Sequence, residues 1–150
     1  MVLLLALITL FAGCGGARTD PEEQVRQWVA AVAAAAQAKE RSAIMDLIAD
    51  SYTDSRGNQP ADIENLLRLY FLRQSKIVLL TKVEEVTIHG TTAADVQVTV
   101  GMAGTNNSAL GISADAYRFE LELEAPEGSD SYSEWRLISA RWAALGQPAI

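Results

Sequence analysis

The sequence predicts an α+β domain in which three N-terminal helices are followed by an antiparallel sheet of four strands. Apolar residues recur at helical spacing up to about residue 73, and from Lys76 onward apolar and polar residues alternate. Three helices can cover only one face of such a sheet, which gives a two-layer arrangement. Without its first 13 residues the 150-residue chain keeps 137, the size of one ordinary domain.

The helices are expected over residues 21–38, 41–49 and 60–73. Asp20 can cap the first helix, and Pro21 fits its first position because the missing N–H is not needed there. The third helix carries an apolar face, so we expect its members to be buried, Leu67 and Phe71 in the core. That face consists of Ile63, Leu66, Leu67, Tyr70 and Phe71.

The strands are expected over residues 77–89, 94–102, 117–123 and 135–142. In the first strand the alternation slips at Glu84-Glu85, which predicts a β-bulge. The second and third strands alternate cleanly, with apolar residues inward and all carboxylates outward. The last strand is apolar on both faces, which indicates a central or bulged strand. The outward residues of the middle strands are Asp95, Gln97, Thr99, Arg118, Glu120, Glu122 and Glu124.

Composition excludes several classes of site. The net charge is −7 with no cluster of Lys and Arg, so a nucleic-acid phosphate backbone would be repelled. The single Cys cannot form a disulfide within the chain, and the single His argues against a His-based zinc site. The outer acidic residues are spaced too widely along their strand to share one calcium ion. We therefore expect no metal and no cofactor.

The N-terminus is a run of apolar residues that ends at the only cysteine. Residues 2–13 carry no charge. They are too few to span a bilayer, which needs about 20 apolar residues, but they suit the apolar core of a signal peptide. Leu10-Phe11-Ala12-Gly13-Cys14 resembles the lipobox of bacterial lipoproteins. The alternative is a plain apolar terminus with an unrelated cysteine.

The lipobox resemblance implies a boundary and a location. Residues 1–13 would be a signal peptide, residues 14–19 the lipidated Cys14 with a tether, and residues 20–145 the folded domain. Cys14 would carry acyl chains such as palmitate, which anchor the protein in the cell envelope. Gly15 stands where Asp commonly marks inner-membrane retention, so the resemblance favours the outer membrane facing the periplasm, if the source is Gram-negative.

Three stretches resemble the nuclear transport factor 2-like superfamily, which includes ketosteroid isomerases and polyketide cyclases. They are residues 43–52, 63–73 and 134–142, and the resemblance covers Pro21 to Ala143. It implies a strongly curved antiparallel sheet that wraps around the helices as a cone, with a pocket at the open end. Because members of this superfamily include enzymes, partner-binding domains and transport factors, the fold does not give the function.

The aromatic residues of this sequence are candidates for lining a pocket in such a cone. The alternative is that they pack in the core, which is the commoner place for aromatic side chains. The candidate lining residues are Trp28, Tyr52, Tyr70, Phe71, Tyr117 and Trp135, and Trp142 is a further aromatic that could line it. The isomerase-like members use a carboxylate base beside an oxyanion donor, and we find no such pair at inward positions. Asp50, Asp54 and Asp115 lie at loop edges and His89 ends a strand, so all four are expected to be solvated turn residues.

The sequence thus favours a noncatalytic, membrane-anchored lipoprotein domain of the cell envelope that binds a small apolar ligand or a protein partner. The alternative is a small isomerase- or cyclase-like enzyme that uses the cone pocket; an accessory structural role is a third reading. The expected partner common to all three is the membrane, through the lipid on Cys14. The sequence leaves the oligomeric state open.

Overall fold

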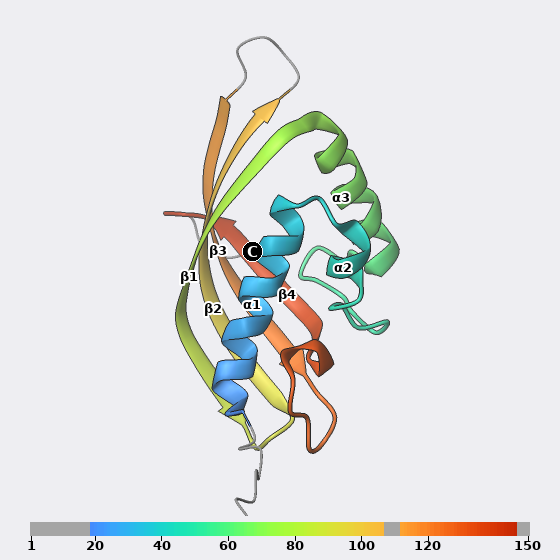
Figure 1. Ribbon diagram of the computed structural model, residues 1–150, viewed down its shortest axis with the longest axis vertical. Helices are drawn as coiled ribbons and strands as arrows, with labels where there is room; N and C mark the ends of the chain where they lie inside the picture. The colour runs from blue at the N-terminus through green and yellow to red at the C-terminus, as the bar shows by residue number, and fades with distance from the viewer. Residues whose placement is uncertain (1–18, 107–111, 147–150) are drawn as a thin grey trace, which may run out of the picture.

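The computed structural model describes residues 19–106 and 112–146. The predicted signal peptide and Cys14 lie outside these residues. The described helices all lie on one side of the sheet (Figure 1), and none of them is long and apolar enough to cross a membrane. They are α1 (Pro21–Gln37), α2 (Arg41–Met45), α3 (Pro60–Arg73) and the 3₁₀ turn η1 (Tyr132–Glu134).

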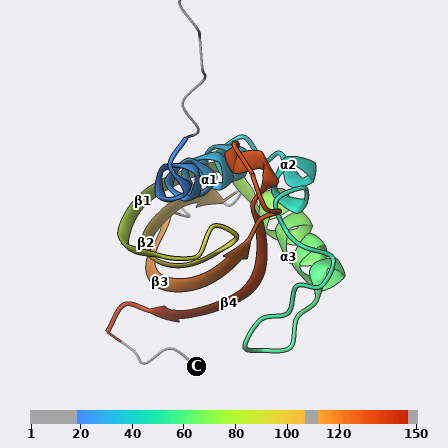
Figure 2. The same ribbon diagram turned by 90° about the horizontal axis from the view of Figure 1, so that it is seen from below.

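The sheet is an antiparallel meander in the order β1-β2-β3-β4, so the predicted α+β fold class is confirmed. Figure 2 shows the sheet curving around the helical side of the molecule. The predicted bulge is present, because the pairing of Val83 with Val98 is followed by that of Glu85 with Gln97. The strands are β1 (Gln74–His89), β2 (Ala93–Asn106), β3 (Ile112–Glu124) and β4 (Arg136–Ala144).

The start of α1 differs from the prediction in one detail. Pro21 occupies the first turn as expected, but the Asp20 side chain makes no capping hydrogen bond. Its carbonyl oxygen instead accepts from the backbone N–H of Gln24 at 3.0 Å. The helix is therefore begun by Pro21 and its backbone, and the carboxylate of Asp20 adds only its charge near the N-terminus.

The second helix is shorter than predicted, because the chain after it pairs with β4. Ala49 N donates to Leu137 O at 2.9 Å, and Ser55 N donates to Ala140 O at 3.2 Å. This segment covers the free edge of β4. The apolar residues on both parities of β4 have another cause: Leu137 pairs with Leu123 and Ala140 pairs with Leu121, so both lie on the concave face. The register between β3 and β4 also shifts at Glu122 and Leu123, as the expectation of a bulged strand requires.

The core lies between α1 and the half of the sheet that α1 covers. Val25, Trp28 and Val29 face this half from α1, and all are at most 6% exposed. Apolar side chains from three strands, from the loop after α2 and from Trp135 between η1 and β4 close the other side. These are Ala94, Val96, Val98, Leu123, Leu137, Ala140, Trp135, Leu47 and Tyr52.

The prediction that α3 places Leu67 and Phe71 in the core was wrong, although Ile63 of the same face packs against the core. None of its residues is buried; Leu67 and Phe71 are only half-buried, and Leu66 is 52% exposed. The reason is that α3 packs beside α2 and the start of β1 and stands away from the rest of the sheet (Figure 1). An amphipathic pattern shows which face of a helix is apolar, but it does not show how much of that face other elements cover.

Candidate functional site on the concave face of the sheet

The concave face of the sheet continues beyond the C-terminal end of α1, where α3 stands opposite it (Figure 1). On this open half the register places Val100 opposite Tyr117, Met102 opposite Asp115, and Phe119 opposite Trp142. All six side chains lie on the same face as buried Val98 and Leu123, because residues two apart along a strand share a face. The open half of the concave face is therefore mainly apolar and aromatic.

Three aromatic rings form a row across β3 and β4. The ring centroids of Tyr117 and Phe119 are 6.4 Å apart, and those of Phe119 and Trp142 are 6.2 Å apart with an interplanar angle of 26°. The guanidinium carbon of Arg56 lies 4.6 Å from the centroid of a Trp142 ring, which is within cation–π distance. Phe119 and Arg56 were not among the predicted pocket residues, although the alternation along 117–123 already pointed Phe119 inward.

One carboxylate also lies on the concave face. Asp115 was expected at a loop edge, but β3 begins earlier than predicted and includes it on the inward side, opposite Met102. The expectation that all carboxylates of these strands point outward is corrected at this residue. Asp115 is exposed, so its charge is solvated at the open end of the cone.

Tyr70 of α3 is within electrostatic range of Asp115 and Tyr117 across the open end of the fold. Burial of the Tyr70 phenol raises its pKa above the usual value, and the charges of Asp115 and Tyr117 raise the pKa further. Tyr70 is consequently a neutral phenol at physiological pH, able to donate a hydrogen bond. A carboxylate and a phenol donor thus stand at the edge of the aromatic row.

Asp54 is buried, whereas the sequence predicted a solvated turn residue at this position. Its carboxylate accepts hydrogen bonds from the backbone N–H groups of Arg56 and Asn58, both at 2.9 Å, and from Asn58 Nδ2 at 2.8 Å. Burial alone would raise the pKa of Asp54, but these hydrogen bonds outweigh it and hold the pKa below its usual value. A carboxylate so fully engaged shapes the loop that carries Arg56 and is not available for proton transfer.

The predicted pocket residues divide into two groups. Trp28, Tyr52 and Trp135 are buried in the core, at 3%, 4% and 0% exposure. The pKa of Tyr52 is strongly raised by burial, by the charge of Asp54 and by a hydrogen bond to it. The other three, Tyr70, Phe71 and Tyr117, are half-buried. Tyr117 lies in the aromatic row, whereas Phe71 lines a cleft between α2 and α3.

His89 does not contribute to this face. Its Nε2 is 2.7 Å from Asp95 Oδ2, and both side chains are more than half exposed. The register places the pair on the convex side, at the end of the β1–β2 hairpin. Over residues 19–106 and 112–146 no group of three or more His, Cys, Asp or Glu residues could hold a metal ion.

Solved structures share this architecture at low sequence identity. A scytalone dehydratase-like protein from Novosphingobium aromaticivorans matches with a TM-score of 0.73 and 7% identity, over 86% of this chain and 85% of its own. A nuclear transport factor 2-like superfamily protein from Salmonella enterica serovar Typhimurium matches with a TM-score of 0.69 and 11% identity, over 87% and 94%. The fold is nuclear transport factor 2-like.

A further neighbour with the nuclear transport factor 2-like fold is a ketosteroid isomerase-like protein from Erwinia carotovora atroseptica. It has a TM-score of 0.65 and 12% identity, over 83% of this chain and 96% of its own. No protein-family model and no curated protein matches the sequence. At these identities the neighbours establish the nuclear transport factor 2-like fold and leave the function to the residues of the site.

Proposed function

We propose that the open half of the concave face holds a small, mostly apolar molecule that contains a flat ring. The observation that carries the proposal is the aromatic row of Tyr117, Phe119 and Trp142, with Arg56 over Trp142. Aromatic faces bind flat rings by stacking and by excluding water. Val100 and Met102 continue the apolar surface on β2. Few polar groups lie among them, which is usual for small-molecule sites.

The names of the neighbours favour a catalytic use of this face over binding alone, because two of the three are dehydratase-like or isomerase-like. The residues present supply a minimal set for proton transfer at carbon. Asp115 would take a proton from a carbon beside a carbonyl group, and the electron pair of the broken C–H bond would move onto the carbonyl oxygen. The neutral phenol of Tyr70 would donate a hydrogen bond to that oxyanion.

Binding without catalysis is the second candidate. It is favoured by the exposure of Asp115, since a general base acts best in a site from which water is excluded. Asp54 is engaged by its loop, and His89 with Asp95 lies on the convex side. In this reading the protein is a cell-envelope lipoprotein that presents its ligand site from the membrane through acylated Cys14, as the sequence suggests.

Proton exchange on a simple ring-bearing ketone separates the two candidates. The full chain is incubated with α-tetralone in D₂O, and loss of the signal of the protons next to the carbonyl is followed by NMR. Catalysis predicts accelerated exchange, which Asp115→Asn reduces by about 10²–10⁴-fold, the usual contribution of a general base. Glu120→Gln, on the convex side of the same strand, is the matched control.

The other outcomes are equally informative. Chemical-shift changes at Tyr117 and Phe119 without accelerated exchange would favour the second candidate, binding alone. An unchanged exchange rate in Asp115→Asn would remove this residue from the mechanism. If neither exchange nor binding is observed for α-tetralone and a set of other small ring compounds, the proposed site on the concave face is wrong.

A further inference from the structure

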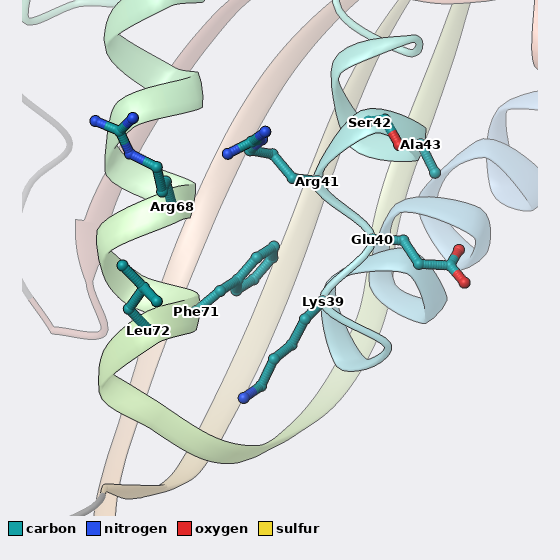
Figure 3. Close-up of a pocket in the computed structure, with 8 residues that line it drawn as sticks. All are labelled: Lys39, Glu40, Arg41, Ser42, Ala43, Arg68, Phe71 and Leu72. Atoms are coloured by element: carbon teal, nitrogen blue, oxygen red, sulfur yellow. The ribbon is translucent and has the colours of Figure 1, made fainter.

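A second candidate site lies between α2 and α3 and carries a different chemistry. It is a cleft of about 650 Å³ between α2, the turn that precedes it and α3 (Figure 3). Neither the aromatic row nor Asp115 contributes to it. The lining residues are Lys39, Glu40, Arg41, Ser42, Ala43, Arg68, Phe71 and Leu72.

Three cationic side chains line this cleft at different places: Arg68 stands on α3, Arg41 reaches toward α3 from the opposite side, and Lys39 lies at the other end beyond Phe71 (Figure 3). Lys39, Arg41 and Arg68 come from three separate segments, and they are three of only 12 Lys and Arg residues in a chain of net charge −7. The one acidic lining residue, Glu40, points away from the cleft in Figure 3. The cleft is therefore positive on a molecule whose charge is otherwise mainly negative, which concentrates anions locally.

The cations are only partly engaged by the protein. Arg41 Nε lies 3.3 Å from Glu64 Oε1, and an Arg68 guanidinium nitrogen donates to Asn65 Oδ1 at 3.0 Å. Each of these contacts uses one nitrogen of a guanidinium group that offers five N–H donors. The Lys39 ammonium donates to the carbonyl of Gln74 at the start of β1, which holds its charge at the cleft.

The cleft also has an unusual backbone conformation at Lys39 and an apolar side formed by Phe71 and Leu72. Lys39 has a φ of 58°, a left-handed conformation that is uncommon for a residue other than glycine. In Figure 3 the Phe71 ring lies between Arg41 and Lys39, with Leu72 beside it. An oxyanion bound by the cations would thus have an apolar surface directly next to it.

We propose that this cleft binds an anionic amphiphile, with a phosphate or carboxylate head held by Arg41 and Arg68 and an apolar chain along Phe71 and Leu72. Guanidinium groups match such oxyanions with paired hydrogen bonds. A half-buried Phe71 and a Leu72 that is 68% exposed provide the complementary apolar surface. The cleft shares no lining residue with the aromatic row, so this proposal does not depend on the function proposed for the concave face.

Calorimetric titration of the full chain with dodecyl phosphate, below its micelle concentration, tests the site. The double variant Arg41→Gln/Arg68→Gln should bind at least about tenfold more weakly than wild type, because two charge-assisted contacts are lost. Arg118→Gln/Arg141→Gln removes the same charge from the convex face and should bind as wild type does. Phe71→Ala should also weaken dodecyl phosphate, and inorganic phosphate should bind far more weakly than dodecyl phosphate does.

Two results would overturn the proposal: equal affinity of the cleft variant and wild type for every anionic probe, or equal affinity of wild type for dodecyl phosphate and inorganic phosphate. Vesicles distinguish a free molecule from a lipid headgroup. If the cleft variant loses affinity for phosphatidylglycerol vesicles but not for monomeric dodecyl phosphate, the anion is a headgroup in a bilayer. Phosphatidylcholine vesicles are the control for binding through the apolar N-terminus, and circular dichroism checks that every variant folds.

Discussion

The indole nitrogen of Trp135 donates a hydrogen bond of 2.9 Å to the side-chain oxygen of Gln24, 111 residues earlier in the chain. Both residues are buried, at 0% and 1% exposure. The Gln24 amide nitrogen donates in turn to the carbonyl of Thr19 at 2.7 Å and to that of Ser129 at 3.3 Å. A single amide therefore joins the start of α1 to the loop and the tryptophan that precede β4.

Gln24→Ala should lower the free energy of unfolding by about 1–3 kcal/mol, because it leaves the buried Trp135 N–H without an acceptor. Urea denaturation measures this loss. Gln27→Ala, one turn later on the exposed side of α1, is the control and should change stability by less than about 0.5 kcal/mol. Equal effects of the two substitutions would contradict the role of Gln24.

Asp54 should make stability depend on pH in acid. Its pKa in the folded protein lies below the ordinary value of 3.8, so the unfolded chain binds its proton more readily. The carboxylate therefore stabilises the fold above about pH 4, and this stabilisation is lost as the pH falls through the lower, folded pKa. Asp54→Asn should be less stable than wild type at pH 7, and the gap should narrow below about pH 4.

Denaturation at a series of pH values from 7 to 2.5 measures this gap. Asp50→Asn removes one charge at an exposed position nearby and serves as the control. A gap between wild type and Asp54→Asn that stays constant across the range would show that the carboxylate charge does not stabilise the loop.

Truncation of Leu123 and of Leu67 to alanine should lower the free energy of unfolding by different amounts. Leu123 is 1% exposed in the core, so Leu123→Ala should destabilise by about 2–5 kcal/mol. Leu67 is only half-buried on α3, so Leu67→Ala should cost about 1 kcal/mol, since less apolar surface is returned to water. Chemical denaturation compares them. A larger effect at Leu67 would mean that α3 packs more closely than the structure shows.

Lipidation at Cys14 stays a prediction from the sequence, because this residue lies outside the described ones. Metabolic labelling with a fatty acid should label the wild type and place it in the membrane fraction, since two or more acyl chains hold a protein firmly in a bilayer. Cys14→Ser should abolish the label. A wild type that is unlabelled and stays in the aqueous fraction would end the lipoprotein reading.

Much of the fold was predictable because its signals are local. The alternation in residues 94–102 and 117–123 predicted two half-buried strands, and the slip at Glu84-Glu85 predicted the bulge that the register contains. The candidate site was less predictable. Of its residues, Tyr70 and Tyr117 were expected, whereas Arg56 stands in a loop whose shape depends on the burial of Asp54.

The sequence by itself determined the order of helices and strands, the faces of the middle strands and the apolar N-terminus, since each follows from the spacing of neighbouring residues. The tertiary structure decided which side chains from distant segments meet. The stacking of Phe119 on Trp142 depends on the register between β3 and β4, and the approach of Tyr70 to Asp115 depends on where α3 stands. No periodicity encodes these distances, because they follow from how bulged, curved strands and a partly detached helix pack in three dimensions.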